Sequence, residues 1–111
     1  MTASYTSSRI SYGDYKFETT LPMGLLSIET DAFAGNSALK SVYIYEGLTE
    51  IGAGAFKNCA NLEAIRIPGT CGYIGAGAFD GTGLKFAYVY RDGYADSWFK
   101  ANMPEVTLIY K

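Results

Sequence analysis

The stretch Ile-Gly-Ala-Gly-Ala-Phe, "IGAGAF", stands at residues 51–56 and returns unchanged at residues 74–79, 23 residues later. When the chain is aligned at this spacing, other apolar residues fall into columns. These columns are Ile28, Ile51 and Ile74; Phe33, Phe56 and Phe79; and Leu39, Leu62 and Leu84, the third copy having lost one loop residue. A fixed period of this length is the sequence signature of a repeat protein, in which each repeat forms one structural unit.

Each repeated leucine is followed by apolar residues at the third and fifth positions after it. The pairs are Val42 and Ile44, Ile65 and Ile67, and Ala87 and Val89. A spacing of two predicts a strand with one buried face. One coil of this size cannot bury enough apolar surface to fold alone, so we expect the coils to stack and share a parallel sheet. The predicted strands lie near residues 17–21, 41–45, 64–68, 86–90 and 105–109, and the glycines at 52, 54, 75 and 77 are interpreted as tight turns.

The pattern I-G-x-x-A-F-x-x-C-x-x-L-x-x-I-x-I-P, complete at residues 51–68, resembles the BspA-type leucine-rich repeat family. The resemblance covers residues 21–90 and departs from the pattern where the Cys59 column reads Asn36 and Thr82. It implies an α/β, mostly β fold: a right-handed leucine-rich-repeat solenoid. Members are mostly surface or secreted proteins of bacteria and some protists, associated with adhesion and protein binding. The family offers no catalytic motif to carry over, so the resemblance implies no enzyme.

The chain is predicted to be a single domain, 1–111, with repeats over 21–90 and caps at 1–20 and 91–111. In the N-terminal cap, Tyr12 and Tyr15 flank a Gly-Asp turn signal, which predicts a β-hairpin. Phe17 is expected to continue from it into the first strand of the sheet. A solenoid exposes its core at both ends, which is why such caps are needed.

The C-terminal cap is predicted to contain a helix over 94–101 and a final strand over 105–110. Asp92 is a suitable N-cap residue, and Asn102 followed by Pro104 would stop the helix. One face of this helix carries apolar side chains that could close the last coil. They are Ala95, Trp98 and Phe99.

Composition narrows the range of partners. The chain has 111 residues, a net charge of −2 and no histidine. It has no basic stripe, so we expect no nucleic-acid partner, and no run of about 18 apolar residues, so we expect no membrane span. The first ten residues contain no apolar signal segment. With only two cysteines and no histidine we expect no metal site. We also expect no cofactor. We expect a monomer.

Three sets of residues could support chemistry, and each also has a structural interpretation. The "GAGAF" stretch lacks the last glycine of a dinucleotide-binding loop, with Lys57 and Asp80 at that place, and its duplication favours a structural role. Two carboxylate pairs are expected to be solvated loop residues rather than an acid–base site; they are Glu46 with Glu50 and Asp92 with Asp96. Cys59 and Cys71 occupy columns that are not cysteine in other coils, which favours buried, reduced thiols.

The strand positions between the buried ones should share the outer, concave face of the sheet. The candidate binding residues there are Tyr43, Tyr45, Arg66, Phe86, Tyr88 and Tyr90. Tyrosine and arginine are enriched where proteins bind, although aromatic neighbours also stabilise a sheet on their own. Arg66 is expected between Tyr43 and Tyr88 in an open patch, so that its loss would leave folding nearly intact.

Two functions remain open at this point. One is a non-enzymatic binding or adhesion module of a bacterial cell-surface or secreted protein, which uses this tyrosine-rich face to hold a protein or a glycan. The alternative is a structural spacer that supports other domains of a larger protein. Attached catalytic or anchoring segments in the full reading frame would favour the spacer.

Overall fold

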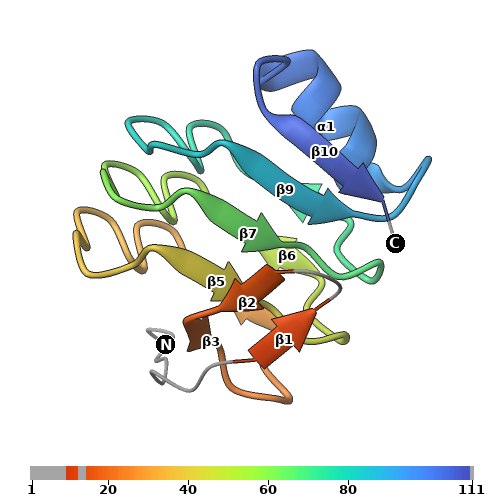
Figure 1. Cartoon of the computed structure of the whole chain (residues 1–111), viewed down its shortest axis with the longest axis horizontal. Helices are drawn as coiled ribbons and strands as arrows, with labels where there is room; N and C mark the ends of the chain where they lie inside the picture. The colour runs from red at the N-terminus through yellow and green to blue at the C-terminus, as the bar shows by residue number, and fades with distance from the viewer. Residues whose placement is uncertain (1–9, 13–14, 111) are drawn as a thin grey trace.

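The computed structural model of the protein describes residues 10–12 and 15–110 and shows the repeats as stacked coils (Figure 1). Each coil adds one strand to a five-stranded parallel sheet with the order β10-β9-β7-β5-β3. The strands are β3 (Thr19–Thr20), β5 (Ser41–Tyr43), β7 (Ala64–Arg66), β9 (Phe86–Val89) and β10 (Thr107–Tyr110). Val42 pairs with Ile65 and Ile65 with Ala87, so matching residues of successive repeats lie side by side. The predicted solenoid is confirmed.

A second sheet, which the sequence did not predict, is built on the repeated isoleucine. Its strands are β4 (Ser27–Ile28), β6 (Glu50–Ile51) and β8 (Tyr73–Ile74), paired in parallel in the order β4-β6-β8. Each strand has two residues, of which the isoleucine is buried. A strand this short cannot be predicted from the alternation of apolar and polar residues, because that alternation needs about four residues to be recognised.

The core lies between the two sheets and is centred on a column of stacked phenylalanines. The ring centroids of Phe33 and Phe56 are 5.4 Å apart, and those of Phe56 and Phe79 are also 5.4 Å apart. The interplanar angles of these two pairs are 18° and 4°. All three phenylalanines are buried. The 23-residue period therefore places identical side chains in identical, mutually stacked environments.

The repeated glycines have two different structural reasons, and only one of them was predicted. Gly54 and Gly77 have φ values of +64° and +68°, as expected for tight turns. Gly52 and Gly75 are instead needed because the preceding coil lies against them. A Cβ atom on Gly52 would lie 2.6 Å from the backbone nitrogen of Thr30 and 2.9 Å from the backbone oxygen of Ile28.

Glu29 occupies the same column as Gly52 in the first coil, where its side chain is exposed. We therefore expect Gly52→Ala to destabilise the protein by about 1–3 kcal/mol through overpacking. Glu29→Ala should cost less, because it shortens an exposed side chain and adds no atom against the neighbouring coil. Chemical denaturation of both variants measures the difference. Equal effects would show that close stacking of the coils is not the reason for the glycine.

The last coil is closed by helix α1 (Tyr94–Asn102), one residue longer than the predicted helix. As predicted, its apolar face covers the core: the ring centroids of Phe99 and Trp98 lie 5.6 Å and 5.8 Å from that of Phe79. The predicted N-cap is wrong. Gly93 is the N-cap and makes no side-chain capping bond, whereas Asp92 adopts a φ of 63° before it.

Asp96 joins α1 to β10, so its expected place on a solvated loop is also wrong. The carboxylate is buried and accepts hydrogen bonds from the Asp92 N–H at 2.8 Å and the Tyr110 hydroxyl at 2.9 Å. Lys100 forms an ion pair with it at 3.3 Å. Burial alone would raise the pKa of Asp96, but these donors outweigh burial and lower it. The ionised carboxylate thus ties the C-terminal strand to the helix.

The N-terminal hairpin forms as predicted, from β1 (Ile10–Tyr12) and β2 (Tyr15–Phe17), paired antiparallel. Its turn, residues 13–14, lies outside the described residues. Figure 1 shows the hairpin in front of the five-stranded sheet. Phe17 ends β2 instead of starting the first strand of the large sheet, which begins at Thr19. This difference decides what the outer face of the sheet can do.

Candidate functional site

The outer face of the five-stranded sheet brings the predicted binding residues together. We call it the aromatic face; it carries Tyr43, Tyr45, Arg66, Phe86, Tyr88 and Tyr90. Tyr43 pairs in register with Arg66, and Arg66 with Tyr88, so Arg66 stands between two tyrosines as expected. Strand alternation was sufficient to predict which side chains share this face.

The hairpin covers the centre of the aromatic face with its own rings. The ring of Phe17 lies 5.7 Å from Tyr43 and 5.4 Å from Tyr88, and Tyr12 lies 5.3 Å from Tyr43. Tyr15 lies 5.3 Å from Phe86 on the other side. These contacts are edge-to-face, the arrangement that aromatic rings prefer.

As a result, Tyr43, Arg66 and Tyr88 are buried, and the expected open patch at these three residues is wrong. The hairpin packs the rings of Tyr15 and Phe17 against the aromatic face. Removal of this apolar surface from water favours the docked position of the hairpin. Substitution of Arg66 or Tyr88 would therefore act on folding, contrary to the expectation from the sequence. Tyr45 and Phe86 are half-buried, and Tyr90 is exposed.

Polar contacts fix the hairpin at its edges. The Tyr15 hydroxyl donates to Glu63 Oε2 at 3.3 Å, and the Glu18 N–H donates to Ser41 Oγ at 2.8 Å. Burial raises the pKa of Tyr15, so its hydroxyl stays a donor at neutral pH. The hairpin is thus anchored to the sheet by side chains in addition to its rings.

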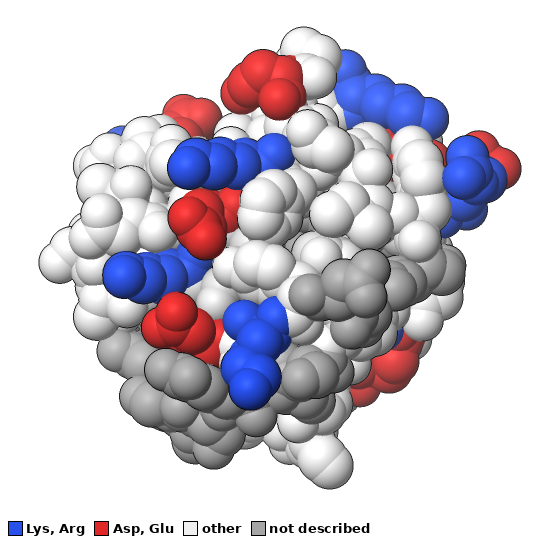
Figure 2. All heavy atoms as spheres, viewed as in Figure 1, with Lys and Arg blue, Asp and Glu red and all other residues white. Residues whose placement is uncertain are grey.

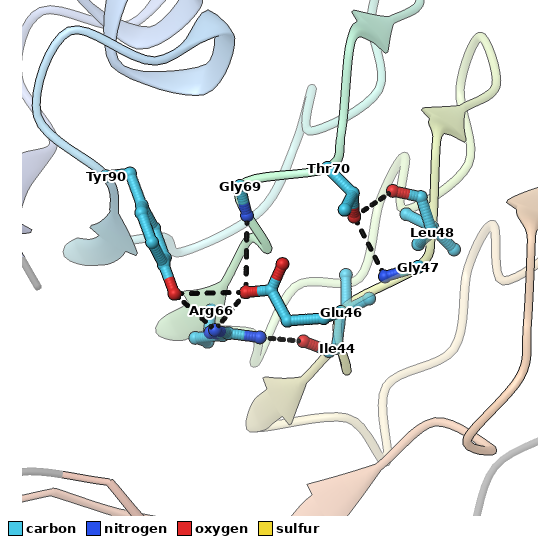
Figure 3. Close-up of polar contacts among 8 residues, drawn as sticks. All are labelled: Ile44, Glu46, Gly47, Leu48, Arg66, Gly69, Thr70 and Tyr90. Atoms are coloured by element: carbon cyan, nitrogen blue, oxygen red, sulfur yellow. Dashed lines mark hydrogen bonds and ion pairs between the residues drawn. The ribbon is translucent and has the colours of Figure 1, made fainter.

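Arg66 is buried as a cation with the rings of Tyr12, Tyr43 and Tyr90 around it, and Figure 3 shows its polar contacts with Ile44, Glu46 and Tyr90. Its Nη1 donates to the carbonyl of Ile44 at 2.6 Å, and its Cζ lies 5.0 Å from the Tyr43 ring centroid and 5.1 Å from that of Tyr12. Burial would lower the pKa of Arg66, but the hydrogen bond with Tyr12 and the nearby acidic groups raise it. Its Nε has no hydrogen-bond partner in the described part of the chain. The ring contacts offset part of that cost.

Glu46, which was expected to be a solvated loop residue, forms an ion pair with Arg66. Its Oε2 accepts from Arg66 Nη2 at 2.6 Å, from the Tyr90 hydroxyl at 3.1 Å and from the Gly69 N–H at 3.4 Å. Burial acts to raise the pKa of Glu46, but the bonds from Tyr90 and Arg66 outweigh it and lower the pKa. The hydrogen bond to Glu46 raises the pKa of Tyr90. The contact between Glu46 and Arg66 could have been anticipated from the sequence, because the loops that follow adjacent parallel strands lie together.

Tyr45, Glu46, Gly69 and Tyr90 form an accessible edge of the aromatic face, which we call the Glu46 rim. Tyr90 is 39% exposed as a whole residue, and the Glu46 side chain is 48% exposed. Gly69 packs against the Tyr90 ring, since a Cβ there would lie 3.4 Å from a ring carbon. Of the predicted site residues, Tyr45 and Tyr90 in this rim and Phe86 outside it keep part of their surface exposed.

Charges on the same side of the molecule are mixed. Figure 2 shows Lys and Arg side chains close to Asp and Glu side chains, with uncharged surface between these mixed groups. At the starts of three neighbouring strands the sequence alternates in charge, as Lys40, Glu63 and Lys85. A surface of this kind exerts no strong attraction for a highly charged polymer.

In the described part of the chain, the possible metal ligands are not clustered, and the two cysteines are buried. No group of three or more Cys, Asp or Glu side chains there could hold a metal ion. Cys59 and Cys71 are buried free thiols, as predicted, and burial raises the pKa of both. Cys59 Sγ donates to the carbonyl of Phe33 at 3.0 Å. Both cysteines therefore act as core residues.

The helices among the described residues include none long and apolar enough to cross a membrane.

Comparison with known proteins gives one finding. A family model described as "BspA type Leucine rich repeat region (6 copies)" matches residues 10–91. No curated protein and no solved structure gives a match. The matched range includes the hairpin and every strand up to β9, and the stacked coils have the geometry that such repeats require. The chain belongs to the BspA-type leucine-rich repeat family.

Proposed function

We propose that this chain is a non-enzymatic binding module that recognises a protein partner through the exposed edges of its aromatic face. The observation that supports this most is the docked hairpin: the face already holds a β-segment by interlocking rings, with Tyr12 and Phe17 against Tyr43. A surface with this chemistry suits segments of other proteins, because tyrosine and arginine dominate binding hot spots. Tyr45, Phe86 and Tyr90 remain accessible beside the hairpin.

The setting that we propose is an adhesion role in a bacterial cell-surface or secreted protein, with the module acting as a monomer. The surface setting rests on the association of the family with such proteins. No catalytic role is proposed, because Glu46 Oε2 and the Tyr90 hydroxyl are bonded to each other and to Arg66 rather than arranged around a nucleophile.

A structural spacer is the second candidate, and one observation favours it. The hairpin covers the centre of the aromatic face, which leaves less area for a partner than the sequence suggested. The two functions differ in what the exposed aromatic residues do. In a spacer, Tyr45 and Tyr90 contact no ligand, so their replacement has no effect on any binding affinity.

The test is capture of extracellular proteins by the immobilised chain, followed by affinity measurements on the captured partner. We expect Tyr45→Ala and Tyr90→Ala each to weaken binding by more than about 1 kcal/mol. Tyr73→Ala is the matched control, because Tyr73 is an exposed tyrosine on the other sheet. Capture of no partner, or a larger effect of Tyr73→Ala than of the other two variants, would favour the spacer.

A further inference from the structure

We propose that the Glu46 rim is a carbohydrate subsite, in which a sugar ring stacks on Tyr90 and donates a hydroxyl hydrogen bond to Glu46. The inference goes beyond the proposed protein partner and concerns only the rim, not the buried centre of the aromatic face. It rests on how these two side chains are held, on which of their atoms remain available, and on the charge around them.

Tyr90 is held in place from two sides while its ring remains accessible. Its hydroxyl donates to Glu46 Oε2 at 3.1 Å and accepts from Arg66 Nη2 at 3.3 Å (Figure 3). Gly69 supports the ring at van der Waals distance, yet Tyr90 remains 39% exposed. A fixed ring of this kind offers a flat apolar surface on which the C–H face of a sugar can pack without ordering a side chain first.

Glu46 is fixed in the same way and leaves one oxygen for a ligand. Within the described part of the chain, the three donors to its carboxylate, from Arg66, Gly69 and Tyr90, all reach Oε2, and Figure 3 shows the other oxygen pointing away from them. The following loop is also held, since the Gly47 N–H donates to Thr70 Oγ1 at 2.9 Å. Oε1 is thus a pre-positioned acceptor on a side chain that is 48% exposed.

The charge at the rim favours a neutral donor over a cation. Glu46 is already neutralised by the ion pair with Arg66 at 2.6 Å. A lysine or arginine of a partner would meet no net negative charge there. A hydroxyl group needs only the acceptor, and sugars present several beside their apolar faces.

Tyr45 sets the expected size of the ligand. Tyr45 lies two residues after Tyr43 of β5, and Tyr90 lies two residues after Tyr88 of β9. In the sheet, β7 lies between β5 and β9. Neighbouring strands are about 4.8 Å apart, so the two tyrosines stand about 10 Å apart along the sheet. One sugar ring cannot cover both. An oligosaccharide can stack on Tyr90 and reach Tyr45 with a second ring.

The test is titration of the whole ¹⁵N-labelled chain with maltotriose, cellotriose, chitotriose and mannotriose, followed by NMR of the backbone amides. We expect at least one trisaccharide to give saturable shifts at Gly69 and Arg91, which flank the Tyr90 ring in sequence or space. Tyr90→Ala should weaken that binding by at least about tenfold, the loss expected for a truncated hot-spot ring. Tyr90→Phe, which keeps the ring, should weaken it less. Tyr73→Ala should have no effect.

The proposal is overturned if none of the four sugars gives saturable shifts, or if the shifts persist unchanged in Tyr90→Ala with the amide spectrum of a folded protein. A trilysine peptide serves as the competing probe. If it binds the rim more tightly than every sugar, the rim is a site for cationic side chains and the proposal fails. Protein capture and sugar titration are separate measurements, so the failure of one proposal leaves the other standing.

Discussion

Replacement of Phe56 by alanine is expected to lower the free energy of unfolding by about 3–5 kcal/mol, the range for deletion of a buried phenylalanine ring. Phe56 is fully buried, and its ring is stacked between Phe33 and Phe79 at centroid distances of 5.4 Å on both sides. The neighbouring rings belong to the adjacent coils and are held by their own packing, so they cannot close the cavity by collapse.

Urea denaturation followed by tryptophan fluorescence measures this loss, because the single tryptophan, Trp98, packs against Phe79 at the end of the same stack. Phe56→Leu is the matched control and should cost less than about 1.5 kcal/mol, since it keeps most of the buried volume. Equal losses for the alanine and leucine variants would mean that the stack does not depend on the volume of the ring.

The solenoid could be predicted because residues that are equivalent in the sequence repeat occupy equivalent positions in the structure. Val42, Ile65 and Ala87 share a column of the alignment and then share a register in the sheet, so one coil is a template for the next. The second sheet was missed because Ile51 and its neighbour Glu50 form a strand of only two residues. Gly52 was assigned to a turn because sequence alone does not distinguish a positive φ from a close backbone contact.

The candidate site was half predictable for a similar reason. Alternation along a strand places Tyr43, Arg66 and Tyr88 on one face, but it says nothing about what covers that face. The cover is supplied by the hairpin, whose position depends on contacts between residues far apart in sequence. A signal was present in the hairpin itself. Tyr15 and Phe17 alternate with Lys16, which gives β2 an apolar face that must be buried against something.

The hairpin leads to the second large expected effect. Phe17→Ala should remove about 3–5 kcal/mol of the free energy that holds the hairpin on the aromatic face. The Phe17 side chain is fully buried, and its ring lies 4.8 Å from Tyr15, 5.7 Å from Tyr43 and 5.4 Å from Tyr88. A two-stranded hairpin is marginally stable on its own, so loss of this anchor should also unfold it.

Amide hydrogen exchange distinguishes local release from global unfolding. We expect the amides of residues 15–17 to lose their protection in Phe17→Ala, while the amide of Ile65 in the central strand β7 stays protected. Lys16→Ala is the matched control, because this neighbour is exposed on the same strand and should leave exchange unchanged. Unaltered protection of residues 15–17 in Phe17→Ala would show that polar contacts such as Tyr15 with Glu63 suffice to hold the hairpin.

Release of the hairpin would expose Tyr43, Arg66 and Tyr88 and turn the buried centre into the open patch that the sequence suggested. A partner that occupies the centre competes with the hairpin, so its affinity should rise in Phe17→Ala by up to the docking free energy that the substitution removes. A partner or sugar confined to the Glu46 rim does not compete, and its affinity should stay the same. The affinity ratio between Phe17→Ala and Lys16→Ala therefore reports which part of the aromatic face is used.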